Sequence, residues 1–266
     1  MPAAGKRVRL RMYRQGLGDC FLLAFADAEG GQKRLLIDCG VLLGAREAKD
    51  RIRAVANDIL ESTGGRLDVL AITHEHWDHV SGFVQAQREF GQMEVGQVWL
   101  AWTEDPDDPL ARTLRERRDL ALRALIQERS RAGSRTSRAD TAGFAARIET
   151  VMGFFGVAAG PMGAARTGEA LAWVKARWPN PIYLRPGGEP VTIPGLARPR
   201  FFILGPPPDA KLIHQGDPAK GSGEVYLDDP RQGRLGFHLD ALAVGAEGEQ
   251  CPPPFNPAYQ KWSADP

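Results

Sequence analysis

Cysteine is scarce in this sequence, with only Cys20, Cys39 and Cys251 among 266 residues. A set that is odd in number and widely spaced excludes a disulfide framework, and no two of the three have the spacing of a zinc finger. Cys20 and Cys39 fall in apolar strand-like runs, where a thiol is normally inert packing. Charge of one sign is not in excess either, because 34 Lys and Arg residues meet 33 Asp and Glu residues, a net charge of +1. This balance excludes a strongly basic nucleic-acid-binding arm or an acidic tail as the main feature of the chain.

Long apolar runs are missing too. No window approaches the roughly 18 uninterrupted apolar residues of a membrane span. Residues 1–7 lead into an alternating pattern and not into the apolar block of a signal peptide. We therefore expect a cytoplasmic protein without a membrane partner. The sequence also has no glycine-rich phosphate loop and no serine nucleophile elbow.

The periodicity of the apolar residues alternates between that of strands and that of helices. Alternating or short apolar runs closed by turn residues predict strands over 8–13, 20–25, 34–40, 67–73 and 95–102. Apolar residues at helical spacing predict helices over 45–62 and 82–90. Strands that alternate with helices indicate a layered α/β architecture.

The second half of the chain has a different organisation. Residues 103–180 are predicted to form a helical insertion, in which Asp108 and Pro109 have the types preferred at an N-cap and the first helical position. Further helices are expected to begin near Asp140 and to cover 169–178. Short strands return over 182–184, 190–193 and 200–204, and a Pro- and Gly-rich tail follows.

A histidine cluster follows the strand predicted over 67–73. Three of the five histidines of the chain fall within six positions, at His74, His76 and His79. In an extended segment His74 and His76 point the same way, so they could hold one metal ion, and Asp78 with His79 could hold a second. Imidazole and carboxylate ligands favour zinc, with Mn²⁺ or Fe²⁺ as alternatives. The competing interpretation is a polar loop whose histidines only cap backbone groups.

The cluster resembles a known signature. The run from His74 to His79, His-Glu-His-Trp-Asp-His, is similar to the His-x-His-x-Asp-His motif of the metallo-β-lactamase-fold hydrolases. Residues 16–23 and 35–40 look like the opening hairpin of that fold, and most like the branch related to the soluble domain of competence proteins of the ComEC/Rec2 type. The resemblance implies an αββα sandwich with the metal site at one edge. It also implies that His74 and His76 serve a first metal, that Asp78 and His79 serve a second, and that Asp38 orients ligands by hydrogen bonding.

The family completes its site with later ligands, for which this sequence offers few candidates. They are His214, Asp217 and His238. The alternative is that Asp217 belongs to a solvated Gly-Asp-Pro turn and that His238 is satisfied locally. We expect a single domain over 1–266, in which 6–102 form the first half with the metal motif. In that division 103–180 are the helical insertion, and 181–266 are a partial second half with the Pro- and Gly-rich tail.

These features predict a metal-dependent hydrolase in which a metal-bound hydroxide attacks a phosphodiester, an ester or a lactam. One or two zinc ions would be held by the cluster, and Asp78 would also orient the nucleophile as the candidate catalytic residue. Arginines concentrate over 112–138 and tilt the expected substrate slightly toward phosphodiesters, with another small molecule as the alternative substrate and nucleic acid as a further candidate partner. The alternative for these arginines is a solvated helix face, with Asp119 and Arg123 paired at four-residue spacing.

Two other functions remain open from the sequence. One is a metal-binding or interaction module without turnover that is a fragment of a longer protein, since the second half looks incomplete. The other is an iron-dependent redox member of the same fold. The sequence leaves the oligomeric state open.

Overall fold

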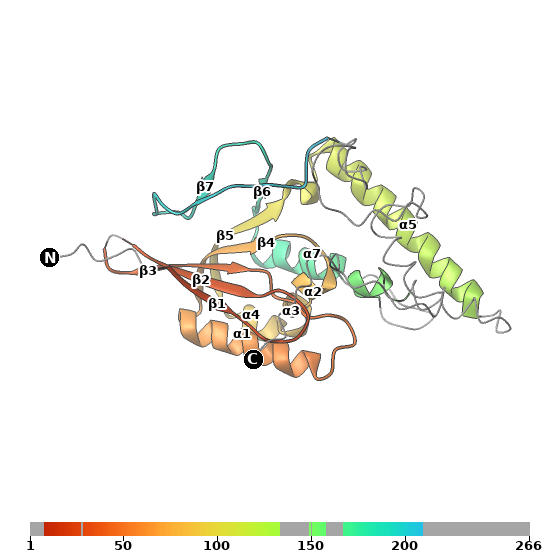
Figure 1. Cartoon of the computed structure of the whole chain (residues 1–266), viewed down its shortest axis with the longest axis horizontal. Coiled ribbons are helices and arrows are strands. Elements are labelled where there is room, and N and C mark those ends of the chain that lie inside the picture. The colour runs from red at the N-terminus through yellow and green to blue at the C-terminus, as the bar shows by residue number, and fades with distance from the viewer. Residues whose placement is uncertain (1–7, 28, 134–148, 150, 158–166, 210–266) are drawn as a thin grey trace, which may run out of the picture.

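The computed structural model describes residues 8–27, 29–133, 149, 151–157 and 167–209 (Figure 1). Its main sheet has six strands in chain order. They are β1 (Val8–Met12), β2 (Phe21–Ala26), β3 (Gln32–Ile37), β4 (Arg66–Ile72), β5 (Glu94–Ala101) and β6 (Ile182–Leu184). The pairs β1–β2 and β2–β3 are antiparallel, whereas β3, β4, β5 and β6 run parallel. Carboxyl ends of the parallel strands therefore meet at one edge of the sheet, where α/β proteins place their ligand sites.

Helices connect the parallel strands. They are α1 (Ala48–Thr63), α2 (Trp77–Val80), α3 (Gly82–Gln85), α4 (Gln87–Phe90), the 3-10 helix η1 (Trp102–Glu104), α5 (Pro109–Gly133) and α7 (Thr167–Arg177). Figure 1 shows α1 on one side of the sheet, with β7 on the other and α5 extending away from the sheet. The predicted α/β class is confirmed by this mostly parallel sheet and its helices.

The larger apolar core lies between the sheet and the helices. In α1, Ile52, Val55, Ala56 and Ile59 recur at helical spacing and are buried, because this stripe faces the sheet. The helix ends at Gly64, whose φ of 64° suits a residue without a Cβ. Side chains of α3, α4 and α7 join the same cluster. Each fully buried aliphatic side chain stabilises the fold by roughly 1.5–3 kcal/mol, which is why this layer fixes the strands that carry the site.

The opposite face of the sheet has a smaller cover. A two-stranded antiparallel sheet of β7 (Val191–Thr192) and β8 (Arg200–Phe201) contributes to a second apolar cluster with Phe25, Leu35 and Trp99. In the edge strand β1, Val8, Leu10 and Met12 are 57%, 60% and 64% exposed. The described residues thus form one helical layer, the main sheet and a small second sheet, in agreement with the incomplete second half that the sequence predicts.

Several predicted elements differ in length from the observed ones. The helix predicted over 82–90 is interrupted at Ala86, whose φ of −124° and ψ of 38° are not helical, and so it forms α3 and α4. The strand predicted over 200–204 pairs only over Arg200–Phe201. Of the helix predicted from Asp140, residues 151–154 are helical, and 140–148 lie outside the described residues. Within the described part of the chain, no helix has the length and apolar character needed to cross a membrane.

Candidate metal centre

The histidine loop, defined as residues 73–79, consists of the connection 73–76 after β4 and the first three residues of α2. His76 is extended, with φ −65° and ψ 149°, and α2 then begins at Trp77, which is fully buried. Because side chains alternate along an extended backbone, His74 and His76 lie on one side, with ring centroids 4.6 Å apart. The first turn of α2 brings His79 back to His74, at a centroid distance of 3.8 Å. The His74 ring therefore lies beside the rings of both His76 and His79.

Asp38, which directly follows β3, connects two of these rings. Its Oδ1 accepts a hydrogen bond from the Thr73 backbone N–H at 2.8 Å, and its Oδ2 accepts one from the Thr73 hydroxyl at 2.6 Å. Oδ2 also lies 2.9 Å from Nδ1 of His79. Since the Thr73 hydroxyl donates to Asp38, it can accept from Nδ1 of His74, 3.0 Å away. Both histidines then carry hydrogen on Nδ1 and leave the Nε2 lone pair free for a metal ion.

The backbone of Asp38 adopts an unusual conformation. Its φ is 54°, in the left-handed region that costs a residue with a Cβ about 1–3 kcal/mol. The side chain is 1% exposed, and all its contacts with Thr73 and His79 depend on this geometry. With two donors on Oδ2, Asp38 fits the role of a residue that orients ligands better than the role of a ligand.

Burial and neighbouring charge act in opposite directions on the histidines. At His79 burial lowers the pKa, but the hydrogen bond and charge of Asp38, together with Asp78 and Asp19, outweigh it and raise the pKa above its ordinary value. At His74 burial dominates, followed by the charge of His79, and the pKa is lowered. The two rings therefore differ in charge preference in the metal-free protein, with His79 the more readily protonated.

Asp78 contributes a carboxylate beside the rings. Its Oδ2 lies 3.7 Å from Nε2 of His79, and its side chain is 21% exposed. The other oxygen, Oδ1, is buried and has no hydrogen-bond partner among the described residues. A buried carboxylate oxygen without a partner is costly unless it binds a cation. This atom, on a side chain that lies next to the His79 ring, could therefore bind a cation.

Asp19 is a member of the site that the sequence did not reveal. It lies in the turn between β1 and β2, and its Oδ2 is 3.6 Å from Nδ1 of His79. Asp19, Asp38 and His79 each offer a ligand atom within 4.8 Å of one another. The backbone N–H of Asp19 donates to the carbonyl of Asp78 at 3.0 Å. Tertiary contacts of this kind bring residue 19 to the loop, and no sequence spacing predicts them.

Two glycines allow the histidine loop to approach the sheet. A Cβ on Gly40 would lie 2.2–2.4 Å from backbone atoms of Asp78 and His79, and one on Gly18 would lie 2.6 Å from the Asp78 carbonyl oxygen. The N–H of Cys39 donates to the carbonyl of His79 at 2.8 Å. The loop is therefore hydrogen-bonded directly to the end of β3, which fixes the ligands relative to Asp38.

The helical insertion borders the other side of the loop. Glu75 forms an ion pair with Arg118 of α5, and burial raises the pKa of the Glu75 carboxyl. The His76 ring lies 5.4 Å from the ring of Phe154 and 5.5 Å from that of Phe155. The predicted solvated face of α5 is thus wrong for Arg118, and Asp119, expected to pair with Arg123, accepts hydrogen bonds from Arg118.

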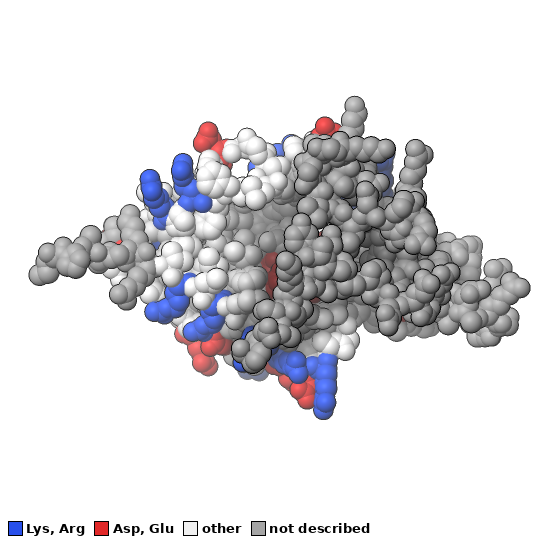
Figure 2. All heavy atoms as spheres, in the orientation of Figure 1, with Lys and Arg blue, Asp and Glu red and all other residues white. Residues whose placement is uncertain are grey.

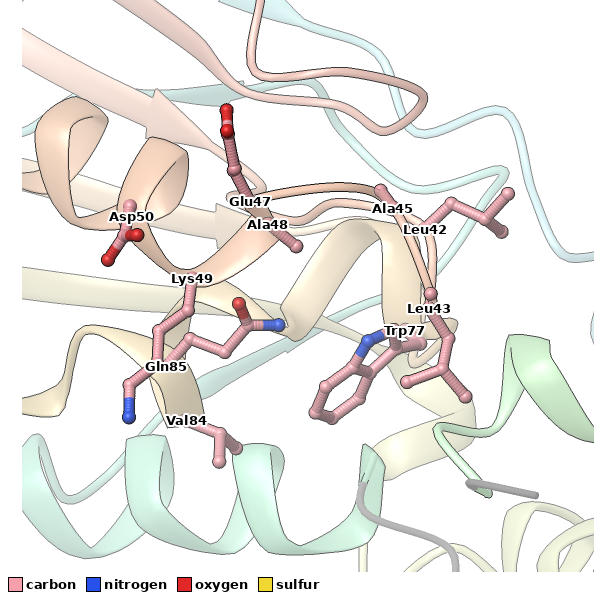
Figure 3. Close-up of a pocket in the computed structure, with 11 residues that line it drawn as sticks. Leu42, Leu43, Ala45, Glu47, Ala48, Lys49, Asp50, Trp77, Val84 and Gln85 are labelled. Carbon is pink, nitrogen blue, oxygen red and sulfur yellow. The ribbon is translucent and has the colours of Figure 1, made fainter.

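Two cavities lie near the loop. One, of about 420 Å³, is lined by residues 42–45 and 47–50 and by Trp77, Val84 and Gln85 (Figure 3). Trp77 is its one contribution from the histidine loop within the described residues, so this cavity is separate from the candidate ligands. The other, of about 340 Å³, is mostly apolar and lies between the carboxyl ends of the parallel strands and residues 201–205, reaching Thr73.

The remaining predicted ligands cannot be placed against this centre. His214, Asp217 and His238 lie outside the described residues, so their role stays a prediction. Of the other predicted residues, His74 lies beside His76 and His79, whereas Asp38 and Asp78 lie beside His79. The group whose ligand atoms all lie within 4.8 Å of one another consists of Asp38, His79 and the additional Asp19.

Comparison with known proteins gives one positive finding. Neither the curated proteins nor the solved structures contain a match to this chain. A family model does match, over a stretch that includes Asp19, Asp38 and the whole histidine loop and ends before the insertion. This stretch, residues 13–97, matches the model of the metallo-beta-lactamase superfamily.

Proposed function

We propose that this protein is a metal-dependent hydrolase with its active centre at the histidine loop. The observation that carries the proposal is the grouping of the His74, His76 and His79 rings next to Asp78, whose Oδ1 is buried and has no hydrogen-bond partner among the described residues. The superfamily match over residues 13–97 supports the same class of function. Kinship with the ComEC/Rec2 branch, suggested by residues 16–23 and 35–40, is part of the proposal.

His74, His76, Asp78 and His79 would hold the metal, and zinc suits this set of imidazole and carboxylate ligands best. A bound zinc ion supplies a Lewis acid and lowers the pKa of water, which is hydrolytic chemistry. Residues around the histidines favour the tautomer that can bind a metal ion through Nε2. Asp38 keeps a proton on Nδ1 of His79, directly, and on Nδ1 of His74, through the Thr73 hydroxyl. Asp78 would orient the attacking water through its carboxylate.

A phosphodiester is the proposed substrate class, with esters and lactams as the alternatives to be compared. Support comes from the arginines of α5, of which Arg117 and Arg123 are exposed. Arg115 is less available, because it donates to the Asp105 carbonyl at 3.0 Å. In Figure 2, Lys and Arg side chains alternate with Asp and Glu around the visible part of the surface, as expected from a net charge of +1. Recognition of a small phosphodiester therefore has more support than recognition of a long nucleic acid.

Metal analysis and hydrolysis assays test the proposal together. The purified protein should bind zinc, one or two ions per chain, and hydrolyse bis(p-nitrophenyl) phosphate in preference to p-nitrophenyl esters or a chromogenic lactam. His76→Ala should lose bound metal and reduce hydrolysis by about 100-fold or more, on the scale of a lost catalytic group. Gln87→Ala, an exposed position in α4, is the matched control.

Each rival function has its own outcome in this experiment. Unchanged metal content in His76→Ala would contradict the ligand assignment. Bound metal without hydrolysis of any of these substrates would favour the metal-binding module. Visible absorbance of the purified protein would indicate iron and the redox alternative, since zinc is spectroscopically silent.

A further inference from the structure

The insertion helix α5 reaches the histidine loop through one ion pair. Nη1 of Arg118 contacts Oε1 of Glu75, the residue between His74 and His76. Since neighbouring side chains of an extended segment point to opposite sides, Glu75 points away from the side on which the two imidazoles meet. The carboxylate of Glu75 therefore connects one side of the loop to α5, whereas the imidazoles of His74 and His76 lie on the opposite side.

This ion pair is shielded from water. The side chain of Glu75 is 13% exposed and that of Arg118 is 28% exposed. Exposed ion pairs contribute little, but removal of one partner from a buried pair leaves a charge without compensation. Without the guanidinium, the Glu75 carboxyl would take up a proton or turn toward solvent, and in either case its ion pair with α5 would be lost. His74 and His76 flank Glu75 in the backbone, so both rings would shift with it.

Arg118 is itself held in place. Its Nε and Nη2 donate to Oδ1 of Asp119 at 3.0 and 2.9 Å, so the guanidinium bridges two carboxylates. The start of α5 is fixed as well, since the Ala111 N–H donates to Oδ1 of Asp108 at 2.8 Å. Arg185, which follows β6, forms an ion pair with the same Asp108. The start of α5 is thus connected to the end of β6 through Asp108, which fixes the helix that carries Arg118.

We propose that Arg118 is a positioning residue, which holds the histidine loop through Glu75 and makes metal binding depend on the helical insertion. The inference rests on the proposed function for its consequence, metal affinity, but not for the loop geometry itself. Residues that orient metal ligands typically change metal affinity by 10–100-fold when they are replaced. Arg118 acts on the ligands through Glu75 and does not touch the metal.

Cobalt binding measures the consequence. Titration of the full chain with Co²⁺, followed by visible absorption, should give a dissociation constant raised about 10-fold or more in Arg118→Met and in Glu75→Gln. Arg118→Lys should recover part of the affinity, because it restores the charge without the planar fork. The variant that combines Arg118→Met and Glu75→Gln should bind Co²⁺ no more weakly than the single variant of lower affinity, because both substitutions remove the same ion pair. Arg117→Met, at the exposed position directly before Arg118, should bind Co²⁺ with the affinity of the wild type.

Amide hydrogen exchange measures the loop in the metal-free protein. Peptides that cover residues 73–79 should exchange about tenfold faster in Arg118→Met than in Arg117→Met, whereas those of β4 should be unchanged. Circular dichroism checks that each variant is folded, and Arg118→Lys provides a second variant if Arg118→Met is not. Equal exchange and equal Co²⁺ affinity in the Met variants would overturn the inference. A wild type that binds no Co²⁺, with the exchange difference present, would overturn the proposed function alone.

Discussion

Nδ1 of His79 lies 2.9 Å from Oδ2 of Asp38, a residue 41 positions earlier whose side chain is almost fully buried. The contact joins the end of β3 to the first turn of α2. It determines which nitrogen of the imidazole can serve a metal ion, because the nitrogen that faces Asp38 is occupied by hydrogen. Asp38 therefore acts on the centre from the interior of the protein.

Replacement of Asp38 by Asn tests this relationship. Asn tolerates the left-handed backbone of residue 38, so the fold should survive. Loss of the negative charge should lower the His79 pKa in the metal-free protein and weaken metal binding by about 10–100-fold. NMR titration of the His79 ring measures the first effect, with Asp50→Asn, an exposed position in α1, as control.

The raised pKa of His79 also predicts how the free energy of unfolding changes with pH. Because the folded pKa of His79 is raised, its contribution to the free energy of unfolding is fully present below the unfolded value of about 6.5 and is lost as pH rises through the folded pKa. The stability gap between the metal-free wild type and Asp38→Asn should therefore narrow as pH increases over that range. A gap that widens would contradict the role of Asp38.

Gly40→Ala should damage the centre without touching a ligand. The added methyl would lie 2.2–2.4 Å from the backbone of Asp78 and His79, which cannot move without breaking the bond from Cys39 N–H to His79. Overpacking of this kind costs about 1–3 kcal/mol or more. We expect a lower Tm and reduced zinc content. Gly168→Ala in α7, where a Cβ meets nothing within 4 Å, should leave zinc content unchanged and stabilise slightly.

Zinc should stabilise the folded protein. A ligand that binds only the folded state adds about 4 kcal/mol when its free concentration is 1,000 times the dissociation constant. Thermal unfolding with Zn²⁺ and after removal of metal by a chelator should therefore differ in Tm, and His76→Ala should lose most of the difference. A wild type with the same Tm in both conditions would argue against a metal centre.

Cys20 should be unreactive in the native protein. Burial raises the pKa of its thiol, with Cys39 and the nearby carboxylates acting in the same direction. Iodoacetamide at pH 8 should leave the Cys20 peptide unlabelled until urea is added, as mass spectrometry would show. Because the folded pKa is raised, the contribution of Cys20 to stability is present below the unfolded pKa of about 8.5 and declines as pH rises above it. Rapid labelling of the native protein would contradict this burial.

The sequence was sufficient for the strands of the main sheet and for the histidine loop, because both depend on local patterns. Alternation predicts β1 to β5 closely, and the order of residues from His74 to His79 brings the rings together through an extended segment and one helical turn. The break at Ala86 was not predictable, since the apolar spacing of residues 82–90 is also that of one continuous helix.

Contacts between distant segments account for the rest. Asp19 lies in a turn whose glycines indicate only a turn, and its place beside His79 follows from the packing of Gly18 and Gly40 on the loop. The ion pair of Arg118 with Glu75 was not predicted, for a similar reason. Sequence spacing proposes partners on the same helix, whereas Glu75 reaches Arg118 only after the insertion folds back on the sheet.

The strands on either side of the insertion are neighbours, with Ala101 of β5 opposite Leu184 of β6. The insertion thus leaves the sheet after β5 and returns to it at the adjacent strand, β6. A change in the length of the insertion can therefore leave the register of β5 and β6 unchanged. An altered insertion would still have to place a cation beside Glu75, because the proposed positioning of the histidine loop depends on that ion pair.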